Sequence, residues 1–284
     1  MAKLILVEGI PGSGKSTTAR KIEQLLNSRD VNVRCFNEGD LHPCDLAWHS
    51  CVPLPRYEQL LNTFVEEKEV LKQYTSVEEN YAYVAYTKLE LKPDHPLFIE
   101  LASYEPYNGK VSLQKFKDLH FSRWKRFGEQ THDDTTYIFE CAYLQNHIVE
   151  LILTYQQSHE YIKEYMKELI ETVRSLEPVL IYLSPTDVAW TINNAANERK
   201  TDRPDIWNDW INNVIAYIEN SNYGKAHNVT GLTDCLEFFK QRQRLELDII
   251  RELPIETYVQ EVQVDFKQGG LEENPELTSM VLKR

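Results

Sequence analysis

Long hydrophobic runs are missing from this sequence of 284 residues. A membrane-spanning helix needs about 18 or more apolar residues in a row, and no uncharged stretch approaches that length. The apolar run at residues 4–7 is also too short for the hydrophobic region of a signal peptide. We therefore expect a cytoplasmic protein without a membrane partner.

Cysteine and positive charge are scarce as well. The five cysteines are scattered and form no C-x-x-C pair, so reduced thiols are expected rather than disulfides. Lys and Arg together number 31 against 44 Asp and Glu, which gives a formal net charge of −13. Proteins bind nucleic acids largely by neutralising phosphates with Lys and Arg, so this balance argues against a nucleic-acid partner.

The first forty residues show the pattern of a strand, a turn, a helix and a second strand. Residues 4–7 are uniformly apolar, as in a strand buried on both faces, and a glycine-rich turn follows at residues 9–14. Apolar residues then recur at helical spacing until about residue 27, and residues 31–35 alternate between apolar and polar. This order predicts a βαβ unit.

Strand and helix patterns alternate through the rest of the chain. Further strands are predicted at residues 137–139, 179–183 and 258–264, with a weaker one at 97–99. Helical patterns occupy residues 57–74, 78–91, 113–127, 146–176, 206–219 and 234–253. No repeat or Gly/Ser/Pro linker divides them. We therefore predict one α/β domain over residues 1–284, with a largely helical insertion at 41–136 and a polar tail at 267–284.

The turn after the first strand carries the sharpest motif. Residues 9–17 match G-x-x-x-x-G-K-[ST], the Walker A pattern, between an apolar strand and an amphipathic helix. In such a loop, backbone amides converge on phosphate oxygens at the N-terminus of the helix. The lysine reaches the β- and γ-phosphates, and the hydroxyl after it coordinates Mg²⁺. The predicted cofactors are therefore ATP and Mg²⁺, held by Gly9, Pro11, Gly12, Ser13, Gly14, Lys15, Ser16 and Thr17.

With this loop near its N-terminus, the chain resembles the P-loop kinases of the nucleotide and nucleoside kinase type, a group of small-molecule kinases. The resemblance implies a three-layer P-loop NTPase fold with a five-stranded parallel core sheet and ATP at the carboxyl ends of the strands. Glu8 and Gly9 resemble the Glu-Gly pair that opens the loop in deoxynucleoside kinases. Those enzymes carry an Arg after the carboxylate that ends the third core strand, whereas Cys141 follows Glu140 here.

The resemblance also implies roles for two carboxylates that follow predicted strands. Asp40 comes after the second strand, where such kinases place the general base that accepts the proton of the acceptor hydroxyl, and Glu38 is the reserve. Alternatively, residues 38–40 form only a polar turn. Glu140 ends a buried strand, where the group places an acidic residue beside the metal, so Ser16 and Glu140 are the predicted metal residues.

A polar, basic segment at residues 197–204 lies between two helical patterns. In kinases of this type the matching segment is a mobile lid whose arginines neutralise charge on the transferring phosphate. Arg199 and Arg203 are the candidates, and together with Lys15 and Asp40 they complete the predicted catalytic set. The alternative is a solvated loop with incidental charges.

The predicted insertion is rich in aromatic residues that either line an acceptor pocket or form a core. They are Tyr81, Tyr83, Tyr86, Tyr104, Tyr107, Phe116, Phe121, Trp124 and Phe127. The insertion also contains two H-x-C pairs. Two His and two Cys are able to form a tetrahedral zinc site, although this spacing is not a usual one for zinc. The four residues are His42, Cys44, His49 and Cys51.

These features predict an ATP-dependent kinase that phosphorylates a small-molecule acceptor. The sequence does not decide whether the acceptor is a nucleotide, a nucleoside or another hydroxyl compound. The other hypothesis is an ATP-binding or ATP-hydrolysing switch without such an acceptor. No N-K-x-D run that would read guanine is present, which disfavours a GTP-dependent switch. We expect a nucleoside triphosphate and a small acceptor as partners, and a homodimer stays open.

Overall fold

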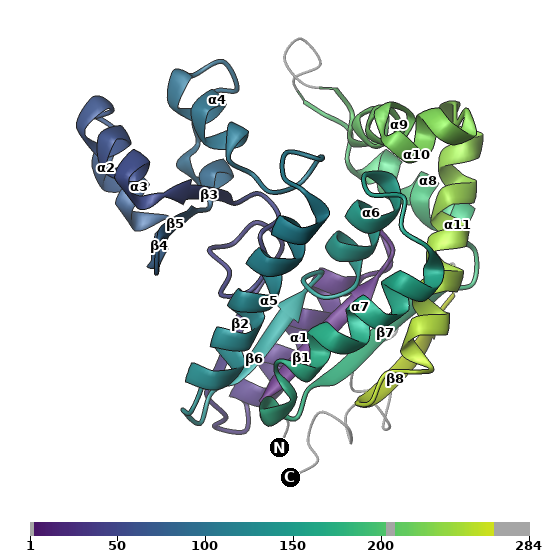
Figure 1. Cartoon of the computed structure of the whole chain (residues 1–284). Helices are drawn as coiled ribbons and strands as arrows, with labels where there is room; N and C mark the ends of the chain where they lie inside the picture. The colour runs from purple at the N-terminus through teal and green to yellow at the C-terminus, as the bar shows by residue number, and fades with distance from the viewer. Residues whose placement is uncertain (1–2, 203–207, 264–284) are drawn as a thin grey trace. The chain divides into compact units, whose positions relative to one another are not determined.

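Five strands form a parallel sheet in the order β2-β6-β1-β7-β8 (Figure 1). Their bounds are β1 Leu4–Gly9, β2 Val33–Phe36, β6 Thr136–Glu140, β7 Val179–Pro185 and β8 Glu256–Val262. Every residue of β1 and β6 is buried, as their continuous apolar sequences predicted. The predicted α/β fold with a five-stranded parallel core is confirmed, and it fits a P-loop NTPase fold.

The computed structural model describes residues 3–202 and 208–263. The predicted tail at residues 267–284 therefore lies outside the described residues. The chain divides into two compact units: a core unit made of residues 1–35 and 128–284, and an inserted unit made of residues 36–127. No helix in the described part of the chain is both long and apolar enough to cross a membrane.

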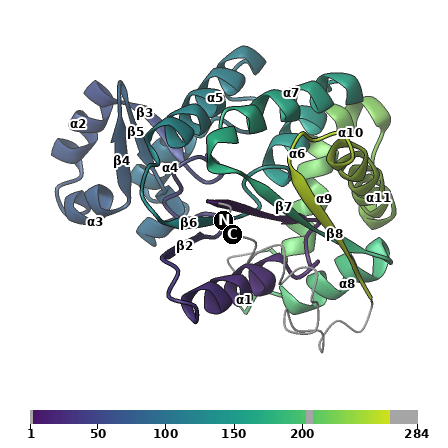
Figure 2. The same ribbon diagram turned by 90° about the horizontal axis from the view of Figure 1, so that it is seen from below.

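Helices cover both faces of the core sheet. Figure 2 shows α1 (Lys15–Asn27) and α8 (Val188–Glu198) on one side and α7 (His159–Glu171) on the other. The apolar face of α1 packs against β1, β6 and β7 in one hydrophobic cluster. A second cluster joins α8 to α6 (Gln145–Leu153), α9 (Trp210–Asn220) and α11 (Gly231–Ile250), with the short α10 (Asn222–His227) beside them. The sheet is thus the middle of three layers.

The inserted unit has a small antiparallel sheet of its own, in the order β3-β5-β4. Its strands are β3 Ser50–Pro53, β4 Thr75–Glu78 and β5 Tyr81–Val84. Around them lie the helices α2 Leu54–Thr63, α3 Lys68–Gln73 and α4 Pro96–Ser103, the 3₁₀ turn at Tyr86–Leu89, and α5 Leu113–Gln130, which continues into the core unit. The prediction of a largely helical insertion is therefore wrong in part.

Two element predictions in this unit are wrong for local reasons. The helix predicted at residues 78–91 covers the turn of the β4–β5 hairpin, β5 and the 3₁₀ turn. Glu79 turns the chain with a φ of 51°, and residues 81–84, Tyr-Ala-Tyr-Val, favour a strand. The strand predicted at 97–99 lies in α4, where Pro96 occupies the first turn and the His95 side chain accepts a bond from Leu97 N.

Two long helix predictions are also broken. Residues 57–74 split into α2 and α3, and residues 146–176 split into α6 and α7, with a 3₁₀ turn at Arg174–Leu176. The second break contains Gln156, whose φ of 48° cannot continue a right-handed helix, and Ser158, whose side chain caps α7.

Six of the nine aromatic residues named in the predicted insertion lie in the interior. Tyr83, Tyr86, Tyr107, Phe116, Trp124 and Phe127 are buried. The H-x-C residues are held by backbone contacts: His49 Nδ1 donates to Ala47 O at 2.8 Å, and His42 Nδ1 accepts from the amides of Cys44 and Asp45. Among the described residues, no group of His, Cys, Asp and Glu is arranged to hold a metal ion. The zinc alternative is therefore not supported.

Candidate functional site

The loop between β1 and α1 turns through three glycines with positive φ, at Gly9, Gly12 and Gly14. Ser13 N donates to Ile10 O at 3.2 Å, which closes the turn. The Lys15 side chain folds back over it, with Nζ 3.0 Å from Ile10 O, and only 6% of Lys15 is exposed. The loop thus wraps its own lysine, and the ammonium group is held against the loop backbone.

Gly9 and Gly12 are required by close packing as well as by their backbone angles. A Cβ on Gly9 would lie 2.6 Å from Leu183 O in β7, and a Cβ on Gly12 would lie 2.9 Å from Thr191 O in α8. Pro11, between them, is half-buried. Gly14 is the N-cap residue of α1, and no side chain caps this end of the helix. The first-turn amides and the helix dipole therefore favour an anion here.

The sheet order places this loop at the switch point of the fold. β1 lies between β6 and β7, so the chain leaves β1 toward β2 on one side and reaches β7 on the other. Open α/β sheets bind ligands outside the carboxyl ends of their strands at such a point. Glu140 ends the neighbouring β6 and pairs with Val7, two residues before β1 ends at Gly9.

The structure brings the two predicted metal residues together. Ser16 Oγ donates to Glu140 Oε1 at 3.1 Å, and Cys141 Sγ approaches the same oxygen at 3.2 Å. A hydroxyl and a carboxylate are oxygen ligands of the kind that Mg²⁺ takes while keeping most of its waters. Ser13 Oγ is buried and finds no hydrogen-bond partner among the described residues. The donor set at this loop therefore fits a phosphate group with Mg²⁺, and Thr17, also predicted here, is exposed on α1.

A buried polar network that the sequence analysis missed lies behind the loop. Arg242, on α11, pairs with Glu246 through an Nε to Oε1 distance of 2.6 Å. Its Nη2 also lies 3.3 Å from Gly9 O and 3.4 Å from Gln145 Oε1. Tyr182 OH, in β7, donates to the second oxygen of Glu246 at 2.5 Å. The signal in the sequence is an Arg and a Glu four residues apart on the apolar face of α11.

Glu8 belongs to the same interior region. Its two carboxylate oxygens accept bonds from Tyr143 N at 2.7 Å and from Gln145 N at 3.2 Å. Complete burial raises the pKa of Glu8 to about 8, and the nearby Glu246 adds to this, although the backbone amides act in the opposite direction. Glu8 is therefore mostly protonated at neutral pH, and it holds the segment that follows Glu140.

Asp40, the predicted general base, lies in the inserted unit. Its carboxylate pairs with Lys88 Nζ at 2.9 Å and accepts a bond from Asn37 N at 2.9 Å. Partial burial acts to raise the pKa of Asp40, but the bonds from Lys88 and Asn37 outweigh it and hold the pKa below its usual range. The bond from Asn37 N to Asp40 is the kind of bond that the alternative, a polar turn, predicts. The ionised Asp40 carboxylate is also able to accept a proton, as the general-base prediction requires. Glu38, the reserve, is exposed.

The predicted lid residues are described only in part. Arg199 follows α8 and is exposed, with its guanidinium carbon 4.9 Å from the centre of the Trp210 ring. Nearby, Thr201 N donates to Asp209 Oδ1 at 2.9 Å. Arg203 lies outside the described residues. The roles of both arginines therefore stay predictions.

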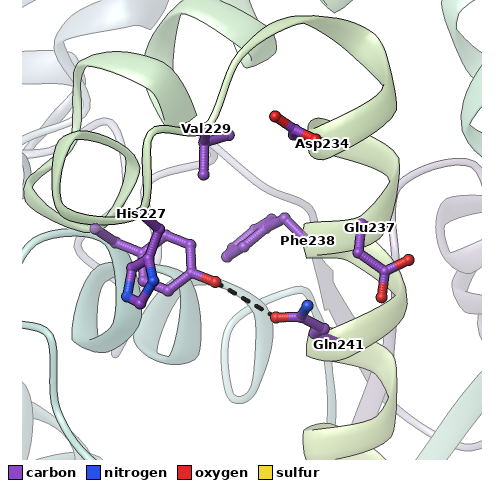
Figure 3. Close-up of a pocket in the computed structure, with 7 residues that line it drawn as sticks. His227, Val229, Asp234, Glu237, Phe238 and Gln241 are labelled. Atoms are coloured by element: carbon purple, nitrogen blue, oxygen red, sulfur yellow. Dashed lines mark hydrogen bonds between the residues drawn. The ribbon is translucent and has the colours of Figure 1, made fainter.

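A separate pocket of about 260 Å³ opens between α10 and α11 (Figure 3). Phe238 is its best-buried lining residue, and the Tyr223 ring stacks on His227 at a centroid distance of 4.3 Å. The carboxylates of Asp234 and Glu237 come from the opposite helix (Figure 3). None of the predicted site residues lines this pocket.

Comparison with known proteins gives a family match at the start of the chain. Residues 1–52 match the model of the family described as chromatin associated protein KTI12. The match spans 52 of the 284 residues, including β1, the glycine-rich loop, α1 and β2. No curated protein matches the chain. The family is P-loop NTPase-like, so the match, the loop and the parallel sheet together indicate a nucleotide-binding P-loop protein.

Proposed function

We propose that the protein is an ATP- and Mg²⁺-dependent phosphotransferase that phosphorylates a hydroxyl group of a small molecule. The observation that carries this proposal is the pairing of Ser16 with Glu140 at 3.1 Å, beside a loop that wraps Lys15. In this proposal the loop binds phosphate and the Glu140 carboxylate binds the metal. The pairing of Ser16 with Glu140 links the two at the switch point of the sheet. The match to the first 52 residues supports the nucleotide-binding part.

The residues of the core unit bind and orient the nucleotide in this proposal. The loop amides and the first turn of α1 contact the phosphates, and the Lys15 ammonium group leaves Ile10 O to reach the β- and γ-phosphate oxygens. Ser16 and Glu140 would hold Mg²⁺, Ser16 as a hydroxyl ligand and Glu140 as an acceptor for a water of the metal. When bound, Mg²⁺ neutralises charge on the phosphate oxygens.

The remaining predicted residues complete the reaction. Asp40 Oδ1 or Oδ2 accepts the proton of the acceptor hydroxyl, with Glu38 as the reserve. Arg199 and Arg203 contact the transferring phosphate, where charge develops. The inserted unit supplies the acceptor-binding region, because it has its own core and carries Asp40.

The experiment is a transfer assay with γ-³²P-labelled ATP, Mg²⁺ and a panel of nucleosides, nucleotides, sugars and amino sugars. Transfer of label to one acceptor class, lost in Glu140→Gln, supports the proposal. Release of inorganic phosphate that no acceptor alters instead supports an ATP-hydrolysing switch. Glu150→Gln on α6 is the matched control, because it removes another buried carboxylate of the core unit. Equal transfer by wild type and Glu140→Gln would contradict the metal assignment.

A further inference from the structure

Arg242 is a cation in the interior of the core unit. It lies on α11 with 2% of its surface exposed, and its partner Glu246 is fully buried. Burial acts to lower the pKa of Arg242, but the adjacent Glu246 carboxylate outweighs it and holds the pKa above its usual range. The guanidinium therefore stays charged, and its contact with Glu246 at 2.6 Å orients it.

Packing alone does not require this pair. The neighbouring positions on the same face of α11 are apolar, at Phe238, Phe239, Leu245 and Ile249. Removing two charges from water costs several kcal/mol per ion, and apolar residues of similar volume often give equal or greater stability. The guanidinium has several N–H donors in fixed directions. Apolar side chains cannot replace these donors.

Those donors point at two segments of the candidate site. Nη2 lies 3.3 Å from the carbonyl of Gly9, the first residue of the phosphate loop. It also lies 3.4 Å from Oε1 of Gln145, the first residue of α6, in the segment that follows Glu140. Glu246 is itself anchored by Tyr182 OH at 2.5 Å, so the guanidinium is oriented from β7 as well.

We propose that Arg242 is the positioning residue that holds the phosphate loop and the Glu140 segment in register, and thereby determines the affinity of the site for MgATP. It does so without touching the nucleotide, through Gly9 O and Gln145 Oε1. The inference rests on the nucleotide-binding part of the proposed function and is independent of phosphoryl transfer. Residues that orient binding groups in this way commonly change affinity by about 10- to 100-fold when removed.

The test is calorimetric titration of MgATP into the double variant Arg242→Met/Glu246→Gln. This variant removes the cation without leaving an unpaired buried carboxylate, and the new side-chain amide still offers the Tyr182 hydroxyl an acceptor oxygen. We expect the Kd for MgATP to rise at least about 10-fold, and the increase in Tm on adding MgATP to shrink accordingly. A wild-type Kd in the folded variant would overturn the proposal.

Three further variants separate positioning from stability. Asp248→Asn/Arg251→Met removes an exposed ion pair from the end of the same helix and should leave the Kd unchanged. Leu245→Ala opens a cavity on α11, so it should lower the Tm without changing the Kd. Arg242→Lys keeps the charge but loses the planar fork of donors, so the Kd for MgATP should rise in this variant too. A wild-type Kd in Arg242→Lys would overturn the proposal even if the double variant does not fold.

The outcome is distinguishable from a failure of the proposed function. A wild-type protein that binds MgATP but labels no acceptor contradicts phosphoryl transfer, while a raised Kd in the Arg242 variants still supports the positioning role. Wild-type protein that binds no MgATP overturns both.

Discussion

At the scale of single residues, three side chains at the site bond to the backbone of neighbouring segments, beside the side-chain pairs already described. Lys15 reaches Ile10 O, Glu8 accepts from Tyr143 and Gln145 amides, and Arg242 donates to Gly9 O. The loop backbone is therefore preorganised for a ligand before one binds. Substitution of single polar residues here should change binding more than stability.

Lys15→Ala should weaken MgATP binding by at least about 10-fold, because it removes the cation predicted to lie nearest the β- and γ-phosphates. The fold should persist, since the Lys15 ammonium group bonds to a loop carbonyl, Ile10 O, rather than to a buried carboxylate. Titration calorimetry measures the affinity, and circular dichroism checks the fold. Lys21→Ala, on the same helix, is the matched control. Unchanged MgATP binding by folded Lys15→Ala would contradict the phosphate-loop assignment.

Asp40→Asn should keep MgATP binding but lower kcat for phosphoryl transfer by a factor of about 10² or more, the usual scale for a general base. The carboxylate is held ionised by Lys88 and Asn37, and the amide cannot accept a proton. Steady-state kinetics with the acceptor found in the transfer assay measures the effect. Glu38→Gln is assayed beside it. If Glu38→Gln loses transfer and Asp40→Asn does not, the base is Glu38.

At the scale of elements, the phosphate loop is held between α1 and α8. Gly12 lies so close to α8 that an added Cβ would be 2.9 Å from both Thr191 O and Ala195 Cβ. Gly12 therefore serves packing against α8 as well as chain direction. This link also connects the loop to Arg199, which follows α8 directly.

Gly12→Ala should lower the free energy of unfolding by about 2 to 4 kcal/mol, through strain at a φ of 82° and collision with α8. Gly231→Ala measures the backbone strain alone, because Gly231 has a φ of 67° but an added Cβ would have nothing within 4 Å. It should cost only about 1 kcal/mol. Urea denaturation measures both. Equal losses in the two variants would mean that the contact with α8 is not tight.

At the scale of the whole molecule, the stability of the fold depends on pH through Glu8. Its pKa is about 8 in the native state, against an ordinary value of 4.5, so the native state binds the extra proton between these pH values. The resulting stabilisation is complete below the ordinary pKa and is lost as the pH rises through 8. Folding is therefore favoured by acid through this one group.

Glu8→Gln mimics the protonated carboxyl and should remove this part of the pH dependence. Between pH 6 and pH 8 the wild-type protein should lose about 2 kcal/mol of stability relative to Glu8→Gln. Urea denaturation at the two pH values measures the difference, with Glu58→Gln, an exposed substitution on α2, as the matched control. A constant difference between wild type and Glu8→Gln would show that Glu8 has the same pKa in both states.

Local patterns were enough to predict the strands of the core sheet, although they joined α6 and α7 into one helix. A continuous apolar strand, a glycine-rich turn and an amphipathic helix determine β1, the loop and α1, because each rule acts within a few residues. The loop residues follow from the same reasoning, whereas the metal role of Glu140 was implied by the resemblance to P-loop kinases and stays a prediction. The prediction failed in the inserted unit, where a left-handed residue, Glu79, turned an expected helix into a hairpin.

The sequence by itself determined the α/β class, the phosphate loop and the carboxylate at the end of β6. Only the tertiary structure decided that Ser16 contacts Glu140, that six of the nine aromatic residues named in the predicted insertion are buried, and that Arg242 reaches Gly9 from 233 residues away. The reason is physical. Backbone preference and apolar periodicity are local, whereas the partner of a buried charge is chosen by the packing of segments that are distant in the chain.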